Sequence, residues 1–99
     1  MEELTAFQRD LLYIIVGLDE PYGLAIKDEI EKYRGDINNG RLYPNLDRLD
    51  NLGLIKKGEK DDRTNSYKIT DLGEEALDDR NDWENKYYTP NSASTQAST

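Results

Sequence analysis

The stretch from residue 40 to residue 58 reads GRLYPNLDRLDNLGLIKKG, and it decides the fold. Its leucines recur at i, i+4, i+7 and i+10, which places them on one face of a helix: Leu42, Leu46, Leu49 and Leu52. Pro44 falls in or just beyond the first turn of that helix, where a missing amide costs little. Gly53 is the residue type expected just after the last turn. The stretch therefore predicts a helix over 40–52 and a short strand over 54–58.

A second strand and a further helix follow. Residues 66–70, SYKIT, have the composition of a strand, and the polar residues 59–65 before them are rich in turn formers. The two strands therefore predict a β-hairpin. Thr70 or Asp71 can cap a helix that continues to about residue 88. From Thr89 onward the chain is polar and has nothing to bury, so we expect a disordered tail.

Two helices precede residue 40. Thr5 and Gln8 have the spacing of a capping box, and apolar residues continue at helical spacing to Leu18. Pro and Gly at 21–23 end this helix, and a second amphipathic segment runs over 24–33. Asn38 or Asn39 is available to cap the third helix.

This order of elements is that of a winged helix-turn-helix, an α+β fold class that is mostly α with a small hairpin. We expect a DNA-binding domain over 1–70, a C-terminal dimerisation helix over 71–88 and a tail over 89–99. The chain has only 99 residues, so one small core is all that it can build.

The composition excludes several classes of function. The chain contains no Cys and no His, which removes thiol chemistry, the commonest general base and the commonest metal ligands. We therefore expect no enzyme, no catalytic residue, no metal and no cofactor. The longest apolar run, Leu11 to Val16, is far too short to span a membrane. The chain opens on Met1-Glu2-Glu3 rather than on a basic signal, so we expect a cytoplasmic protein.

The charge is segregated along the chain. The net charge is −8, yet residues 41–68 carry seven bases and five acids, whereas the flanking segments are each strongly acidic. A polyanionic partner should therefore meet the central block.

Two motifs in this block resemble those of the PadR family of transcriptional regulators. Residues 40–46, GRLYPNL, followed by Leu49 and by 53–55, GLI, resemble the family's Gly-x-Leu-Tyr-Pro-x-Leu core. Residues 63–73, RTNSYKITDLG, resemble its wing. The acidic bias is similar to that of haloarchaeal members, or of a virus or plasmid of such a host. The resemblance implies a winged helix-turn-helix regulator that binds double-stranded DNA.

A helix-turn-helix protein reads base edges from the N-terminal part of its third helix. The candidate base contacts are the residues outside the leucine strip: Asn39, Arg41, Tyr43, Asn45 and Arg48. For Tyr43, packing under the wing is the alternative. The candidate contacts on the wing are Lys60, Arg63, Thr64 and Asn65, with the strand lysines ranked below them.

The fourth helix carries apolar residues for which a 99-residue chain has little core left. We expect a homodimer through Leu72, Ala76, Trp83 and Tyr87, and packing back on the first helix is the alternative. Some members of the resembled family sense aromatic compounds in a dimer pocket, which leaves a small-molecule effector open.

The function that we predict is a sequence-specific repressor that reads a pseudo-palindromic operator as a homodimer. The alternative is a winged helix used for protein–protein contact through its acidic faces. Because salt screens charge, we also expect DNA binding to survive high salt better than it does for a basic winged helix.

Overall fold

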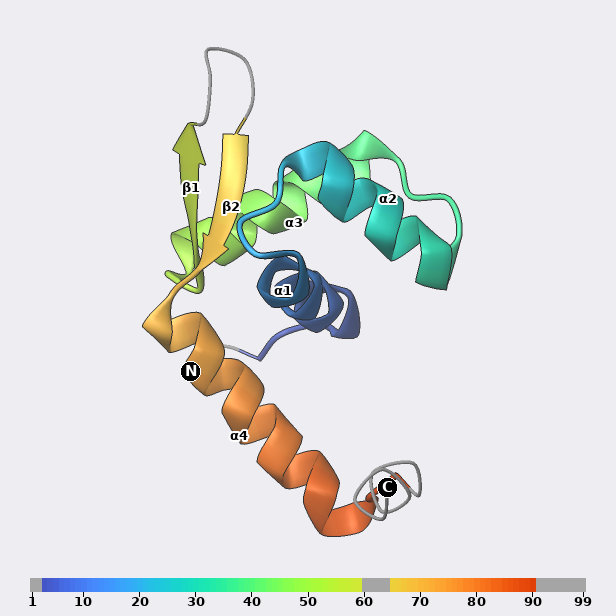
Figure 1. Cartoon of the computed structure of the whole chain (residues 1–99), viewed down its shortest axis with the longest axis vertical. Helices are drawn as coiled ribbons and strands as arrows, with labels where there is room; N and C mark the ends of the chain where they lie inside the picture. Colours follow the sequence, from blue (N-terminus) through green and yellow to red (C-terminus); the bar gives the residue numbers. More distant parts are fainter. Residues whose placement is uncertain (1–2, 60–64, 91–99) are drawn as a thin grey trace.

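The computed structural model describes residues 3–59 and 65–90 and shows the predicted order of elements (Figure 1). Three helices are followed by a two-stranded hairpin and a last helix, which confirms the winged-helix fold. The elements are α1 (Ala6–Leu18), α2 (Gly23–Arg34), α3 (Asn39–Asn51), β1 (Ile55–Glu59), β2 (Asn65–Ile69) and α4 (Asp71–Tyr87). No helix in these two ranges is both long and apolar enough to cross a membrane.

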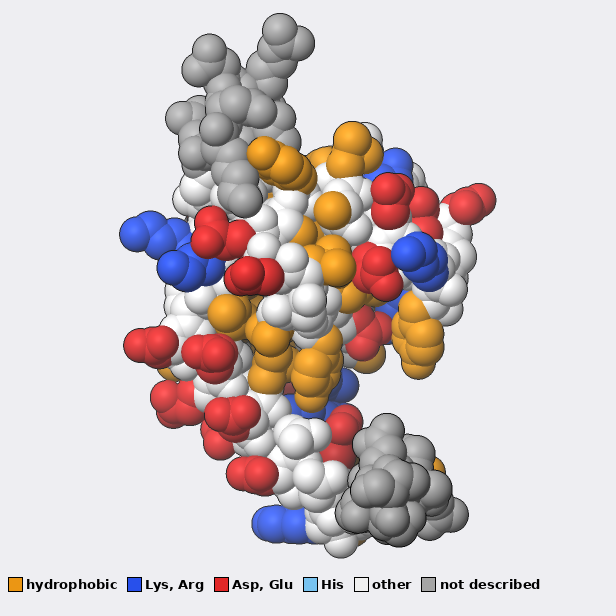
Figure 2. Space-filling model, viewed as in Figure 1, with side chains coloured by type: hydrophobic (Ala, Val, Ile, Leu, Met, Phe, Trp, Pro, Cys, Tyr) orange, Lys and Arg blue, Asp and Glu red, His pale blue; other side chains and the backbone are white. Residues whose placement is uncertain are grey.

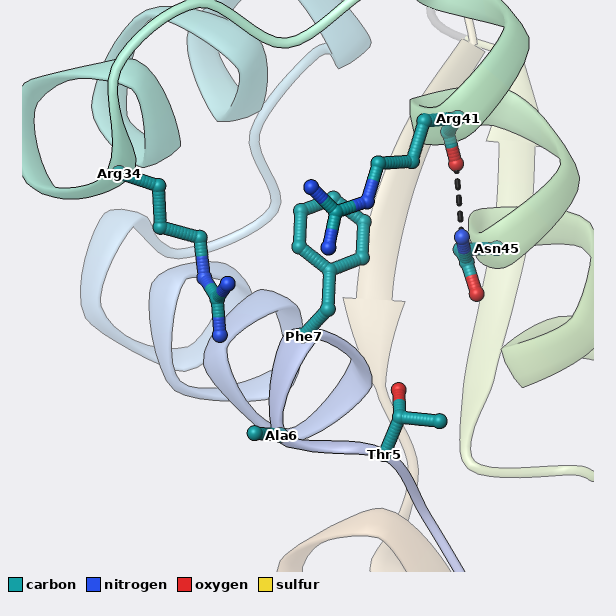
Figure 3. Close-up of a pocket in the computed structure, with 6 residues that line it drawn as sticks. All are labelled: Thr5, Ala6, Phe7, Arg34, Arg41 and Asn45. Atoms are coloured by element: carbon teal, nitrogen blue, oxygen red, sulfur yellow. Dashed lines mark hydrogen bonds between the residues drawn. The ribbon is translucent and has the colours of Figure 1, made fainter.

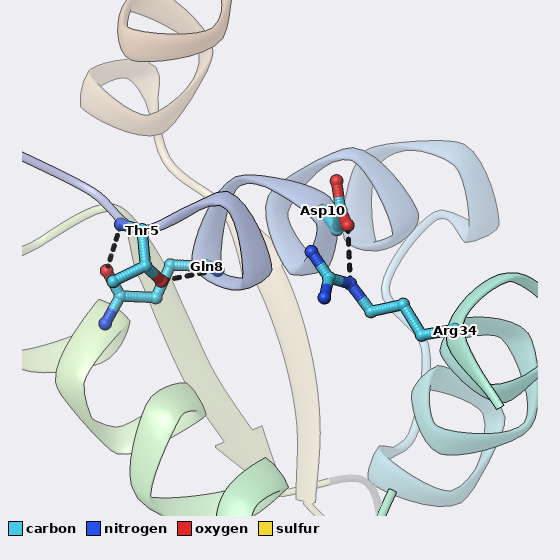
Figure 4. A network of polar contacts seen from close by, with 4 residues as sticks. All are labelled: Thr5, Gln8, Asp10 and Arg34. Carbon is cyan, nitrogen blue, oxygen red and sulfur yellow. Dashed lines mark hydrogen bonds and ion pairs between the residues drawn. The ribbon is translucent and has the colours of Figure 1, made fainter. Parts of the chain in front are cut away.

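The start of α1 has the predicted capping box (Figure 4). The Gln8 amide donates to Thr5 Oγ1 at 3.1 Å, and the Thr5 amide donates to Gln8 Oε1 at 3.0 Å. Two of the amides that a helix start leaves without partners are thereby bonded.

The ends of α3 are also set by local chemistry. Asn38, rather than Asn39, is the N-cap, and its Oδ1 accepts from the Arg41 amide at 2.9 Å. At the other end Gly53 has a φ of 79°, which favours glycine. The Leu54 amide donates to the Leu49 carbonyl at 3.0 Å, so the chain reverses toward β1 in a Schellman motif.

Pro44 stands beyond the first turn of α3, as its sixth residue. The helix therefore lacks the hydrogen bond that an amide at 44 would donate to the Gly40 carbonyl. Both residues are exposed, so water can reach that carbonyl.

The core lies between α1, α2 and α3 and extends to the base of the hairpin. Leu42, Leu46 and Leu49 are fully buried, as the leucine strip predicted, and Leu52 is half-buried. The buried apolar residues are Phe7, Leu11, Leu12, Ile15, Ile26, Ile30, Ile37, Leu42, Leu46, Leu49, Leu54, Ile55, Tyr67 and Leu77.

The hairpin is antiparallel, with Ile55 opposite Ile69 and Glu59 opposite Asn65. Each strand lies one residue closer to the tip than the sequence predicted. The Tyr67 amide donates to the Pro21 carbonyl at 3.0 Å, and Tyr22 forms a β-bridge with Ser66. The wing is thus bonded to the connection between α1 and α2.

Helix α4 begins at the base of the wing and extends away from the core (Figure 1). Its N-cap is Thr70, whose Oγ1 accepts from the Gly73 amide at 3.1 Å and donates to the Gly53 carbonyl at 2.6 Å. Gly73 and Leu77 are buried, whereas residues 81–90 are all exposed. Among residues 3–59 and 65–90, the first half of α4 is therefore the part of this helix that packs on the core.

Candidate nucleic-acid interface

Helix α3 places the five candidate base contacts in two groups. Asn39, Arg41 and Arg48 are exposed, whereas Tyr43 and Asn45 are half-buried. Four other residues share the exposed side of α3 and were missed by the sequence analysis: Gly40, Pro44, Asp47 and Asn51. They lie at i, i+4, i+7 and i+11 on the side opposite the buried leucines, so the helical period could have identified them.

Arg41 turns toward α1. Its guanidinium carbon lies 4.0 Å from the centroid of the Phe7 ring, which is a cation–π contact (Figure 3). Phe7 is nearly fully buried, so its ring is a fixed platform for the arginine. The arginine is thereby held at the edge of α3 rather than extended from it.

Asn45 joins α3 to α1. Its Oδ1 accepts from Gln8 Nε2 at 3.0 Å, and its Nδ2 donates to the Arg41 carbonyl at 2.8 Å. Both ends of the amide are therefore bonded within the chain. To reach an adenine, the side chain must exchange these bonds for bonds to the base.

Tyr43 packs over the start of α2. A Cβ added at Gly23 would lie 2.9 Å from Tyr43 Oη, so the tyrosine occupies the space that this glycine leaves. The structure thus shows Tyr43 packed on α2, whereas the alternative considered for it was packing under the wing. Its contact with DNA stays a prediction.

The wing carries a basic pair that the sequence analysis ranked low. Lys56 and Lys68 are both exposed and stand directly opposite each other on β1 and β2. Like charges in that register repel, and a phosphate between them would relieve the repulsion. Of the predicted wing contacts, Asn65 is exposed at the start of β2, and Lys60, Arg63 and Thr64 lie outside the described residues.

An ion pair fixes the wing against α3. Lys57 Nζ lies 2.9 Å from Asp47 Oδ1, and this hydrogen bond raises the pKa of Lys57. Asp47 is the acid on the exposed side of α3, so Lys57 offsets a negative charge on that side of the helix.

The predicted dimer residues lie along one side of α4, at spacings of four, seven and four. Ala76 packs against the core, and Leu72 Cδ2 lies 3.7 Å from the Cβ position of Gly53. Trp83 and Tyr87 are 50% and 74% exposed, and their ring centroids are 5.2 Å apart. Within the described part of the chain, the two aromatic side chains are not packed against the core.

Charge is unevenly distributed over the molecule. Figure 2 shows acidic side chains along α4 and basic side chains beside the wing strands. The segment 69–99 carries seven acids against two bases, whereas 41–68 has an excess of bases. A polyanion would therefore be attracted to α3 and the wing and repelled by α4.

Three helices with an exposed third helix beside a basic two-stranded wing define a winged-helix DNA-binding protein. Residues 11–79 match the model of the transcriptional regulator PadR-like family. The chain belongs to this family of DNA-binding transcriptional regulators, which are not enzymes.

Solved structures agree with this assignment. RosR from the haloarchaeon H. salinarum, in the complex named hsRosR-S1, is 44% identical, with a TM-score of 0.81 over 96% of this chain and 86% of that one. A transcriptional regulator from Clostridium thermocellum is 26% identical, with a TM-score of 0.65 over 83% of this chain and 92% of that one. The winged-helix DNA-binding protein F93 from STIV shares the fold at 19% identity, with a TM-score of 0.69 over 83% of this chain and 90% of that one. No curated protein sequence matches the chain.

Proposed function

We propose that this chain is a sequence-specific repressor that binds a pseudo-palindromic operator as a homodimer. Helix α3 would enter the major groove, and the wing would contact the minor groove or the backbone. Two observations together carry the proposal. The exposed side of α3 presents Asn39, Arg41 and Arg48, and the wing that follows it presents the opposed lysines of β1 and β2.

Arg41 is the residue of this set to test. An arginine that forks onto a guanine discriminates by roughly 1–3 kcal/mol. Arg41 must leave Phe7 to do so, which costs about 0.5–1 kcal/mol for an exposed cation–π pair. The difference is about 0.5–2 kcal/mol, so we expect Arg41→Ala to weaken operator binding by about 2–30-fold and to relax the preference for one base pair.

Fluorescence anisotropy on the DNA upstream of the chain's own gene, against scrambled DNA, measures this. Lys86→Ala is the control, because it removes one positive charge from the far end of α4. Equal weakening on both DNAs would make Arg41 a backbone contact. A folded protein with no preference for either DNA would favour the protein–protein alternative.

The dimer is supported by the exposed aromatic end of α4. A second copy would cover Trp83 and Tyr87, and a groove of about 250 Å³ between α1 and α4 offers apolar surface from Tyr13, Val16 and Leu77 for it. Two recognition helices about one DNA turn apart suit a palindromic operator. Sedimentation equilibrium should show dissociation for the double variant Trp83→Ala/Tyr87→Ala. Tyr33→Ala, which removes an aromatic side chain that is 82% exposed on α2, should leave the assembly intact.

Salt dependence follows from the charge distribution. A protein with a net charge of −8 meets long-range repulsion from DNA, and this repulsion is screened within about 3 Å at 1 M salt. Added KCl therefore weakens repulsion and attraction together. We expect a shallower loss of affinity with KCl than a basic winged helix shows, and a steep loss would contradict the proposal.

A further inference from the structure

A shallow pocket of about 380 Å³ lies where the start of α1, the end of α2 and the start of α3 meet. Its lining residues are Thr5, Ala6, Phe7, Arg34, Arg41 and Asn45. Arg34 of α2 and Arg41 of α3 both reach toward the Phe7 ring, as Figure 3 shows. The guanidinium carbons of Arg34 and Arg41 lie 5.3 Å and 4.0 Å from the centroid of the Phe7 ring.

Among the residues that the structure describes, the chain pairs one of the two guanidinium groups with an acid and leaves the other without one. Arg34 Nε donates to Asp10 Oδ2 at 2.8 Å (Figure 4), and within the described residues no acid is paired with Arg41. Two positive charges therefore line a small pocket, and Asp10, the carboxylate paired with Arg34, is not one of its lining residues. Such an arrangement leaves one net positive charge and several N–H donors for an incoming anion.

We infer that this pocket binds a phosphate-type oxyanion between Arg34 and Arg41. A tetrahedral oxyanion accepts several hydrogen bonds at once, which suits guanidinium donors that converge from two helices. The stack on Phe7 fixes the plane of the Arg41 guanidinium and so reduces the entropy lost on binding. The positive end of α1 adds to the attraction.

The occupant can come from two sources with the same chemistry. It is either a backbone phosphate of the bound DNA or a free phosphate, and the first source rests on the proposed function. In either case the anion would hold Arg41 against α1, so the arginine could not extend to a base edge at the same time. Occupancy would thus decide whether Arg41 positions the protein or reads sequence.

The first experiment uses the protein alone. Potassium phosphate replaces KCl at constant ionic strength while NMR follows the Nε–Hε signals of the arginines. We expect saturable shifts for Arg34 and Arg41, and binding at least about tenfold weaker in Arg34→Gln and in Arg41→Gln. Asp10→Asn should bind phosphate more tightly, because it removes the competing carboxylate. Lys86→Gln is the charge-matched control and should not alter binding.

The second experiment identifies the source. Single methylphosphonates replace the DNA phosphates one at a time, and affinity is measured for the natural protein and for Arg34→Gln. A phosphate whose neutralisation weakens the natural protein but not the variant is the occupant, and the absence of one assigns the pocket to free phosphate. The inference is overturned if no such phosphate exists and the free protein shows no saturable shifts. It is also overturned if no such phosphate exists and the Arg41 signal of Arg34→Gln shifts as it does in the natural protein. If the protein shows no selective DNA binding, the proposed function fails, and the phosphate titration of the protein alone still tests the pocket.

Discussion

Gly73→Ala tests the junction between the wing and α4. A Cβ at this position would overlap the Leu54 carbonyl oxygen and lie 2.6 Å from Ile69 Cδ1. The Leu54 carbonyl cannot move aside freely, because it accepts from the Thr70 amide at 3.1 Å where the wing meets α4. Either that hydrogen bond lengthens or the whole of α4 retreats from the base of the wing.

The expected loss in the free energy of unfolding of Gly73→Ala is the sum of three contributions. Overpacking costs about 1–3 kcal/mol, and a weakened hydrogen bond costs about 0.5–1.5 kcal/mol. The higher helix propensity of alanine relative to glycine offsets up to about 1 kcal/mol of this loss. We expect a net loss of about 2 kcal/mol, which lowers the Tm by about 8–16 °C for a domain of this size.

Thermal and urea unfolding followed by circular dichroism, at one fixed protein concentration, measures the loss. Gly17→Ala is the matched control, because Gly17 is also helical and nothing lies within 4 Å of its Cβ position. It should leave stability unchanged or raise it by up to about 1 kcal/mol. A Gly73→Ala protein as stable as the Gly17→Ala protein would refute the close approach of α4 to Leu54.

Two further predictions concern the backbone and pH. Glu20 has a φ of 59°, in the left-handed region that costs a non-glycine residue about 1–2 kcal/mol. Glu20→Gly should therefore raise the free energy of unfolding by about 0.5–1 kcal/mol in urea titrations, after the added entropy of the unfolded chain is deducted. The same change at the exposed helical Glu75 should lower that free energy, and equal effects would contradict the argument. Burial raises the pKa of Tyr67 above 10.0, so its contribution to stability is present below pH 10 and is lost as the pH rises through the folded-state pKa. Urea midpoints at about pH 9 and pH 11 should differ less for Tyr67→Phe than for the natural protein, and identical differences would count against this assignment.

The sequence predicts the fold well where the signal is local. The capping box at Thr5, the leucine strip of α3 and the turn at Gly53 each depend on residues within a few positions of one another, and all three are confirmed. The strand ends differ by one residue because the pairing of Glu59 with Asn65 depends on the register of the whole hairpin.

The candidate site depends on contacts that no local pattern contains. Phe7 and Arg41 are far apart in the sequence, as are Gln8 and Asn45, and each pair meets only because α1 packs against α3. The sequence identifies Arg41 and Asn45 as polar residues outside the leucine strip. It does not show that both turn toward α1, because residues that flank a buried strip can pack on a neighbouring helix.

The placement of Arg41 links the pocket and the interface. The residue occupies the third position of α3, where a helix-turn-helix protein contacts DNA, yet its guanidinium rests on a ring of α1 beside a second arginine. A cation–π contact at an exposed site is worth about 0.5–1 kcal/mol, which is less than a fork onto guanine contributes. The contact is therefore strong enough to orient the free side chain and weak enough to be exchanged for a base. Because a bound oxyanion would add charge-assisted hydrogen bonds to the stacked state, it would shift that exchange against base reading.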